Sequence, residues 1–247
     1  MRQLLTAELI KLRTTRTFYA LAGVAIGTSL LITILSASID QPTKANVLSD
    51  VFQSDTSSLF ILILAIVGIS GEWRHRTITS SLLAAPHRTR FLAAKTLAFA
   101  TAGVLLSLAI SISISIVGLA ILEARALPTP DTGDLIELIA RSAGIAALLG
   151  ALGVGIGSLV RNQPVAIVGV LIIAFVIDQV LAQVAPGVER FSPTGALPNA
   201  IQGVDPGDVG MDKVDFLAVA PALAAMLIWI GALLGSGAAL LVSRDVD

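Results

Sequence analysis

The chain has 247 residues, of which 55% are hydrophobic and 13% carry a charge, and its formal net charge is −1. One soluble core of this length cannot bury so much apolar surface, so the composition excludes a water-soluble globular protein and indicates an integral membrane protein. The absence of cysteine excludes disulfides, thiolate catalysis and cysteine-ligated metal sites.

The first element expected is a short helix within residues 1–18. Leu5, Leu9 and Leu12 fall at i, i+4 and i+7, while Glu8 and Lys11 lie mostly on another side. This imperfect pattern predicts either an amphipathic helix in the inner headgroup layer or a basic anchor that fixes topology.

Six apolar blocks follow, each about 18 to 27 residues long, which is the length that a helix needs to cross ~30 Å of hydrocarbon. They cover residues 19–37, 56–73, 97–122, 135–160, 164–185 and 216–242. The strictly apolar part of the second block is short, and its helix can start earlier, near Val47. The sequence therefore predicts a single all-α membrane domain over residues 1–247.

Charge sets the expected orientation of these spans. With the amino terminus inside, eleven of the sixteen basic residues fall on the cytoplasmic side. We therefore predict a multi-pass protein of the plasma membrane with both termini in the cytoplasm. A basic membrane face is normally topological, so no nucleic-acid partner is expected.

A polar stretch, residues 71–95, separates the second and third spans. Thr77 can cap a short helix in which Ile78 and Leu82 share a face, and Pro86 ends it. A plain connector needs neither feature, so the sequence predicts a short helix across the cytoplasmic end of the bundle.

Polar residues inside the spans each have a structural and a functional interpretation. Arg141 and Asp178 are expected at the same depth in antiparallel neighbours, which predicts an ion pair, with Glu137 as a competing partner of Arg141. Asp178 would otherwise be a proton-coupling carboxylate. Ser107, Ser111 and Ser115 share one face and either line a conduit or let helices pack closely.

Two further patterns concern packing and the outer side. Gly23 and Gly27, Gly153 and Gly157, and Gly231 and Gly235 have the spacing of close helix contacts. Residues 186–215 form a long outer loop, whose first half is expected to form short helices dipping into the outer leaflet and whose acidic second half is expected to be solvated.

The polar stretch and the amino-terminal helix together resemble the permease subunits of type-2 ABC transporters. The matching residues are Glu8-Leu9-Ile10-Lys11-Leu12-Arg13, Gly71-Glu72-Trp73-Arg74-His75, Thr77-Ile78, Leu82-Leu83-Ala84-Ala85-Pro86-His87-Arg88 and Ala94-Lys95. Arg76 departs from the glycine that is typical before the threonine. The topology match covers the whole chain, whereas the residue match is confined to about two dozen positions.

The resemblance implies that residues 71–95 form a coupling helix for a separate ATPase subunit, which would bind the ATP and Mg²⁺. It also implies a second permease copy, as a homodimer, and export by alternating access. The ATPase-docking residues so implied are Glu72, Arg74, Arg76, Ile78, Leu82, Leu83 and Arg88.

The chain itself shows no catalytic motif. None of its lysines follows a glycine as a phosphate-binding loop requires, and its two histidines do not form a zinc-protease motif. We expect no enzyme activity, no cofactor and no metal in this chain. Two alternatives to an exporter remain: a non-transporting membrane tether for an ATPase or regulator, and a proton-coupled secondary transporter that uses Asp178.

Overall fold

A computed structural model describes residues 2–74, 88–160 and 162–243, and this part of the chain contains helices and connecting turns without strands. The helices in the first half are α1 (Arg2–Thr14), α2 (Arg16–Ile39), the π-helical turn η1 (Leu48–Phe52), α3 (Ser57–Arg74), α5 (Arg88–Ala124) and α6 (Thr132–Leu159). Those in the second half are α7 (Gln163–Ile172), η2 (Ile173–Ile177), α8 (Asp178–Val184), α9 (Pro186–Glu189), α10 (Ala196–Gln202), η3 (Pro206–Val209) and α11 (Val219–Ser243).

Six helical stretches are long and apolar enough to cross a membrane, as the sequence predicts. They are Arg16–Ile39, Leu48–Glu72, Thr89–Ala124, Thr132–Leu159, Gln163–Val184 and Val219–Leu240. The chain is therefore a multi-pass membrane protein. The Ser-Ile alternation at 111–116 lies inside the continuous helix α5, because a lone strand in lipid would leave its backbone groups unpaired.

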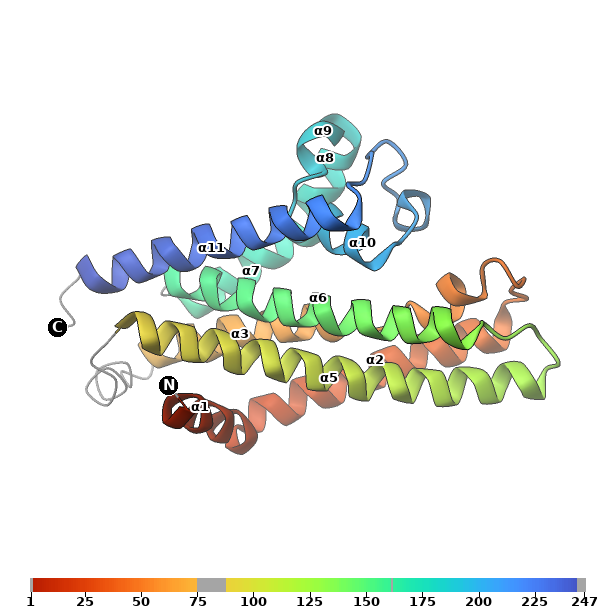
Figure 1. Cartoon of the computed structure of the whole chain (residues 1–247), viewed down its shortest axis with the longest axis horizontal. Coiled ribbons are helices and arrows are strands. Elements are labelled where there is room, and N and C mark those ends of the chain that lie inside the picture. Colours follow the sequence, from red (N-terminus) through yellow and green to blue (C-terminus); the bar gives the residue numbers. More distant parts are fainter. Residues whose placement is uncertain (1, 75–87, 161, 244–247) are drawn as a thin grey trace.

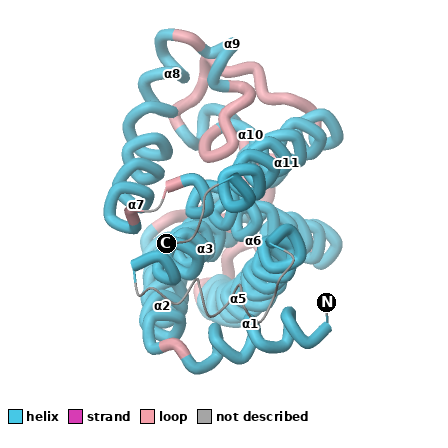
Figure 2. The backbone as a smooth tube through the Cα atoms, turned by 90° about the vertical axis from the view of Figure 1, so that its left-hand side faces the viewer, coloured by secondary structure: helices cyan, strands magenta, loops and turns pink. Residues whose placement is uncertain are grey.

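The long helices lie side by side, and the described chain begins and ends at the same end of the bundle (Figure 1). We call this end the terminal end and the opposite one the far end. α6 is central: 72% of its apolar window is buried, against 17% for the windows of α2 and α11. α1 turns away from α2 at Thr15 and packs against α5 (Figure 2).

Close packing around α6 depends on small residues. A Cβ built on Gly153 would lie 2.6 Å from the carbonyl oxygen of Leu62 in α3, so only glycine allows this approach. Gly157 contacts α3 in the same way one turn later. The other predicted pairs differ: a Cβ on Gly23, Gly27, Gly231 or Gly235 would meet nothing within 4 Å in the described part of the chain.

The second span begins at Leu48, near the early start that its sequence allows, but it is not one straight helix. The turn η1 ends at Phe52, and α3 begins after Asp55, whose Oδ1 accepts a hydrogen bond of 2.8 Å from the backbone N–H of Ser57. A carboxylate at the start of a helix satisfies an N–H that has no intrahelical partner. The break thus places Asp55 between η1 and α3.

The segment after the fifth span forms short helices at the far end. α9 and α10 lie in its first half, and Leu197, Ala200 and Ile201 of α10 are buried against α6 and α11. The second half contains the 3₁₀ turn η3 and several exposed acidic residues. This segment adjoins the start of α11, and its α10 lies over α6 near Arg141 and Ser142 (Figure 1).

Candidate functional site

A cluster of four charged side chains, three of them buried, joins three helices at the terminal end. Lys95 of α5 is its centre, and its Nζ lies 2.8 Å from Glu8 Oε2 of α1 and 2.9 Å from Glu72 Oε1 of α3. Lys95 Nζ also donates to the carbonyl oxygen of Gly68, at 3.3 Å. Only 2% of the Lys95 side chain is exposed, so the ion pairs lie out of water.

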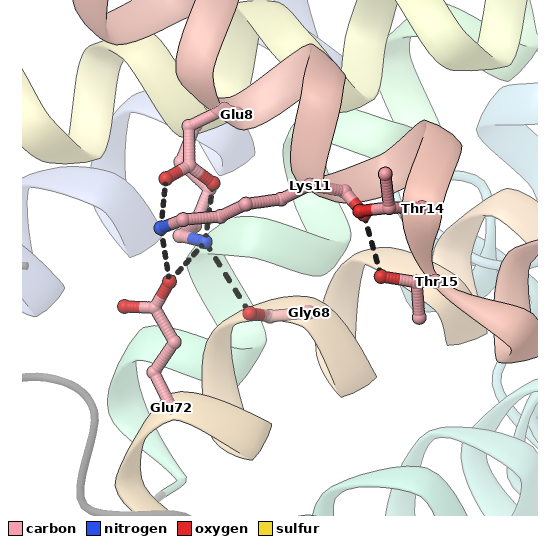
Figure 3. Close-up of polar contacts among 7 residues, drawn as sticks. Glu8, Lys11, Thr14, Thr15, Gly68 and Glu72 are labelled. Carbon is pink, nitrogen blue, oxygen red and sulfur yellow. Dashed lines mark hydrogen bonds and ion pairs between the residues drawn. The ribbon is translucent and has the colours of Figure 1, made fainter.

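Lys11 completes the cluster from the more exposed side. Its Nζ lies 2.7 Å from Glu8 Oε1, one turn earlier in α1, and 3.3 Å from Glu72 Oε1 (Figure 3). Two lysines and two glutamates give no net charge. We refer to Glu8, Lys11, Glu72 and Lys95 as the charge cluster.

The charge cluster shifts the titration of its residues in α1. Burial by itself raises the pKa of Glu8, but the charges and hydrogen bonds of Lys95 and Lys11 outweigh burial and hold that pKa below its usual value of 4.5. For Lys11, burial lowers the pKa, yet the hydrogen bonds and charges of Glu8 and Glu72 raise it above 10.5. Both shifts favour the charged forms of Glu8 and Lys11.

The local packing explains why Lys95 lies inside. A Cβ on Gly68 would overlap the ring of Phe99, so this glycine lets α5 approach α3 closely enough for Lys95 to reach the Gly68 carbonyl. Lys95 Nζ also lies 5.4 Å from the ring centroid of Phe91 and 5.9 Å from that of Phe99. These rings exclude water and add cation–π attraction, so the ammonium depends on the two carboxylates.

The charge cluster brackets the polar stretch of the sequence. α3 ends at Arg74, two residues after Glu72, and α5 begins at Arg88, about two turns before Lys95. Both flanks of residues 75–87 are therefore joined to one another and to α1 by ion pairs that hold three helix ends together.

The residues predicted to dock a partner are only partly described. Glu72 belongs to the charge cluster, while Arg74 and Arg88 are the last residue of α3 and the first of α5, and their side chains are outside the description. Arg76, Ile78, Leu82 and Leu83 fall within residues 75–87, outside the described residues. The expected short helix in this stretch stays a prediction.

The serines of the third span contact a carboxylate. Ser107 Oγ and Ser111 Oγ donate to Asp55 Oδ2 at 2.6 and 2.8 Å, and Ser115 Oγ donates to the backbone carbonyl of Ser111. Ser107 and Ser111 are buried. The contacts of Ser107 and Ser111 join α5 to the break in the second span. All three serine hydroxyls donate hydrogen bonds within the protein.

The predicted ion pair between Arg141 and Asp178 is not formed. Arg141 pairs with Glu137, the competing partner, and donates to the carbonyl oxygen of Gln202 in α10. Asp178 instead accepts hydrogen bonds from Ser192 and Thr194. The physical reason is that α8 and α9 lean away from α6 at the far end, so the two spans are not neighbours there (Figure 2).

Two important residues had no assigned contact at the sequence level. Lys95 lies between Phe91 and Phe99 in an apolar stretch, and an ionisable group there needs a partner, which is the signal in the sequence. Glu189 belongs to the outer segment 186–215, yet it is fully buried beside Asp178. Its apolar neighbours Val188 and Phe191 were the only hint.

No group of three or more His, Cys, Asp or Glu side chains in the described ranges is arranged to hold a metal ion. Comparisons with known protein families and with curated protein sequences found no match for this chain.

Proposed function

We propose that this chain is the membrane-spanning permease subunit of an ATP-driven exporter of the type-2 ABC class. A separate ATPase subunit, which holds ATP and Mg²⁺, docks on residues 71–95 from the cytoplasm. Two copies of the chain form the translocation pathway in the plasma membrane, with all termini cytoplasmic.

The observation that carries this proposal is the position of the charge cluster. A docked ATPase pushes on residues 75–87, and Glu72 and Lys95 receive that force from the two flanks because their ion pair spans 2.9 Å between α3 and α5. Glu8 passes it to α1. Breaking a buried ion pair costs roughly 3–5 kcal/mol, so the three helix ends move together rather than separately. Such a rigid unit is what converts closure of an ATPase into tilting of membrane helices.

A polar cavity at the far end supports the same function. Its volume is about 460 Å³, and it lies between the break in the second span and the α10 to η3 region. Its lining includes Asp50, Gln53, Asp55, Asn199, Gln202 and Asp208. In the proposed cycle this cavity forms part of the outward-facing exit.

The first test is affinity purification of the tagged chain in mild detergent, with mass spectrometry of the proteins that accompany it. A variant with Ile78→Asp, Leu82→Asp and Arg88→Glu removes the expected docking surface. Lys44→Glu is the matched control, because Lys44 is an exposed lysine in the connection on the far side of the membrane. We expect an ATPase with a phosphate-binding loop to accompany the native chain and the Lys44→Glu variant, and to be lost with the docking variant. Absence of any ATPase from the native sample in several detergents contradicts the proposal.

A second measurement separates an exporter from a tether. The chain has no cysteine, so Asn199→Cys provides a single labelling site in the far-end cavity. With the ATPase bound, alternating access predicts that ATP and vanadate change the rate at which a membrane-impermeant maleimide labels this cysteine. A tether predicts the same rate with and without nucleotide. Lys213→Cys, outside the cavity lining, controls for changes in the reagent.

A further inference from the structure

Two carboxylates are buried together at the far end, outside the proposed ATPase-coupling region. Asp178 at the start of α8 is 1% exposed, and Glu189 at the end of α9 is 0% exposed. Both point at Gly195: a Cβ built there would overlap Glu189 Oε1 and lie 3.0 Å from Asp178 Oδ2. The two carboxyl groups therefore share one small, dry space that only glycine leaves open.

Hydrogen-bond donors are divided unequally between the two groups. Asp178 accepts from the hydroxyls of Ser192 and Thr194, at 2.9 and 2.6 Å. Glu189 accepts only from the backbone N–H of Ala196, at 3.2 Å, and its Oε2 is buried without a partner. Donors stabilise a carboxylate more than a carboxylic acid, so Glu189, with one backbone donor, has little support for a negative charge.

No ion pair joins either carboxylate to a cation among the described residues. By sequence, α8, α9, α10 and α11 carry no charged residue other than Asp178 and Glu189 within their bounds. The connecting segments add Arg190 after α9 and, between α10 and α11, the exposed residues Asp205, Asp208, Asp212, Lys213 and Asp215. The guanidinium of Arg190 lies 5.4 Å from the Phe191 ring and 4.0 Å from Asp215, and its Nε is buried without a hydrogen-bond partner. Two adjacent buried carboxylates without a cation cannot both stay ionised at low cost.

We infer that Glu189 is a proton-binding site at the far end, and that a proton on Glu189 holds the segment from α9 to α10, residues 186–202, against α8. Loss of this proton places two negative charges in one buried space and loosens the segment. In agreement, burial first and the charge of Asp178 second raise the pKa of Glu189 from 4.5 to about 7. The segment that packs on α6 and α11 through α10 thus responds to the pH of the compartment that it faces.

Trp229 provides a direct readout. Its indole N–H donates to the carbonyl oxygen of Phe191 at 2.9 Å, so it connects α11 to the segment that Glu189 holds. The chain has two tryptophans, and Trp73→Phe leaves Trp229 as the single fluorophore. Loosening of the segment breaks this hydrogen bond and changes the emission of the indole.

The experiment is a titration of Trp229 fluorescence in lipid nanodiscs, from about pH 5 to about pH 9, on the Trp73→Phe background. We expect one transition with its midpoint near pH 7. Glu189→Gln is expected to abolish it, because the amide cannot titrate. Asp178→Asn is expected to shift it to lower pH, because the neighbouring negative charge is gone. Asp215→Asn, the matched control at the nearest exposed carboxylate, is expected to leave the midpoint unchanged.

Three results overturn the inference. The first is a transition that persists in Glu189→Gln, and the second is a midpoint that stays or rises in Asp178→Asn, which also decides the question if Glu189→Gln does not fold. The third is a midpoint that moves when millimolar calcium is added or removed by a chelator, since the carboxylates would then bind a metal ion instead of a proton.

Discussion

Lys95 in α5 and Glu72 in α3 form an ion pair of 2.9 Å in which the lysine side chain is 2% exposed and the glutamate side chain 10% exposed. The pair lies between the last turn of one membrane helix and the first turns of the next. It is shared with Glu8 of α1, so one ammonium fixes the relative positions of three helices. The stability of the terminal end depends on this group more than on any surface contact.

Replacing Lys95 with methionine is expected to destabilise the protein by about 3–5 kcal/mol, because Glu8 and Glu72 lose their buried cation. Thermal unfolding in detergent, followed by circular dichroism, measures the loss. Adding Glu8→Gln and Glu72→Gln to Lys95→Met is expected to recover most of it. Lys44→Met is the control: its pair with Asp131 spans 3.6 Å between side chains about 70% exposed, so a change within about 0.5 kcal/mol is expected. Equal effects at Lys44 and Lys95 would contradict a special role for the charge cluster.

Two glycines of α3 are expected to respond oppositely to alanine. Gly68→Ala drives a methyl group into the ring of Phe99 and is expected to cost about 1–3 kcal/mol. Gly71→Ala meets nothing within 4 Å and is expected to be neutral or stabilising, because alanine has the higher helix propensity. Melting temperatures of the two variants, measured in parallel, make the comparison. Phe99→Leu is expected to relieve the Gly68→Ala variant, and failure to do so would place the strain elsewhere.

Asp55→Ala is expected to destabilise the break in the second span by about 1–3 kcal/mol, since Ser107, Ser111 and the Ser57 N–H all lose their acceptor. Asp50→Ala changes an exposed carboxylate in the adjoining turn and is expected to have an effect within about 0.5 kcal/mol. Hydrogen exchange with mass spectrometry should show faster exchange at the start of α3 in Asp55→Ala alone. Unchanged exchange there would mean that the serines hold the break without Asp55.

The attachment of α1 is expected to depend on pH in a defined direction. Glu8 has a lowered pKa when folded, so its contribution to stability is complete above its unfolded value of 4.5 and is lost as the pH falls through the lower folded value. Lys11 has a raised pKa, so its contribution is complete below 10.5 and is lost as the pH rises through the higher folded value. Unfolding temperatures measured across the pH range test the loss of stability at low pH and at high pH. Glu8→Gln is expected to reduce the loss of stability at low pH. An unchanged loss in Glu8→Gln would mean that other carboxylates cause it.

The sequence determines the six spans well because their length and apolarity are local properties that a bilayer reads directly. The sequence also predicts an early start of the second span near Val47, and the span begins at Leu48. The partners of buried charges cannot be predicted from the sequence of one helix in this way. Arg141 and Asp178 have matching depths in the sequence, but α8 leans away from α6, and a nearer glutamate one turn before Arg141 takes the arginine.

The ion pairs of the charge cluster, which do form, could not be predicted from the sequence either. Glu8 and Lys95 are 87 residues apart, and nothing in the spacing between them predicts contact. Their contact depends on the packing of α1 against α5 and on the absence of a Cβ at Gly68, which lets α5 approach α3 closely at Phe99. The depth of a residue in the membrane can be estimated from the sequence of one helix. The contacts of the charge cluster depend on how three helices pack together.

The separation of 87 residues between Glu8 and its buried partner also orders the events of synthesis. When α1 has been made and α2 has entered the membrane, Glu8 has Lys11 of the cluster beside it, and Glu72 later arrives as a second carboxylate before Lys95 is available. Only when the third span is inserted does Lys95 become available to both. The amino-terminal helix is therefore committed to its place late, after half of the spans have been made, and the nascent chain keeps that helix free until then.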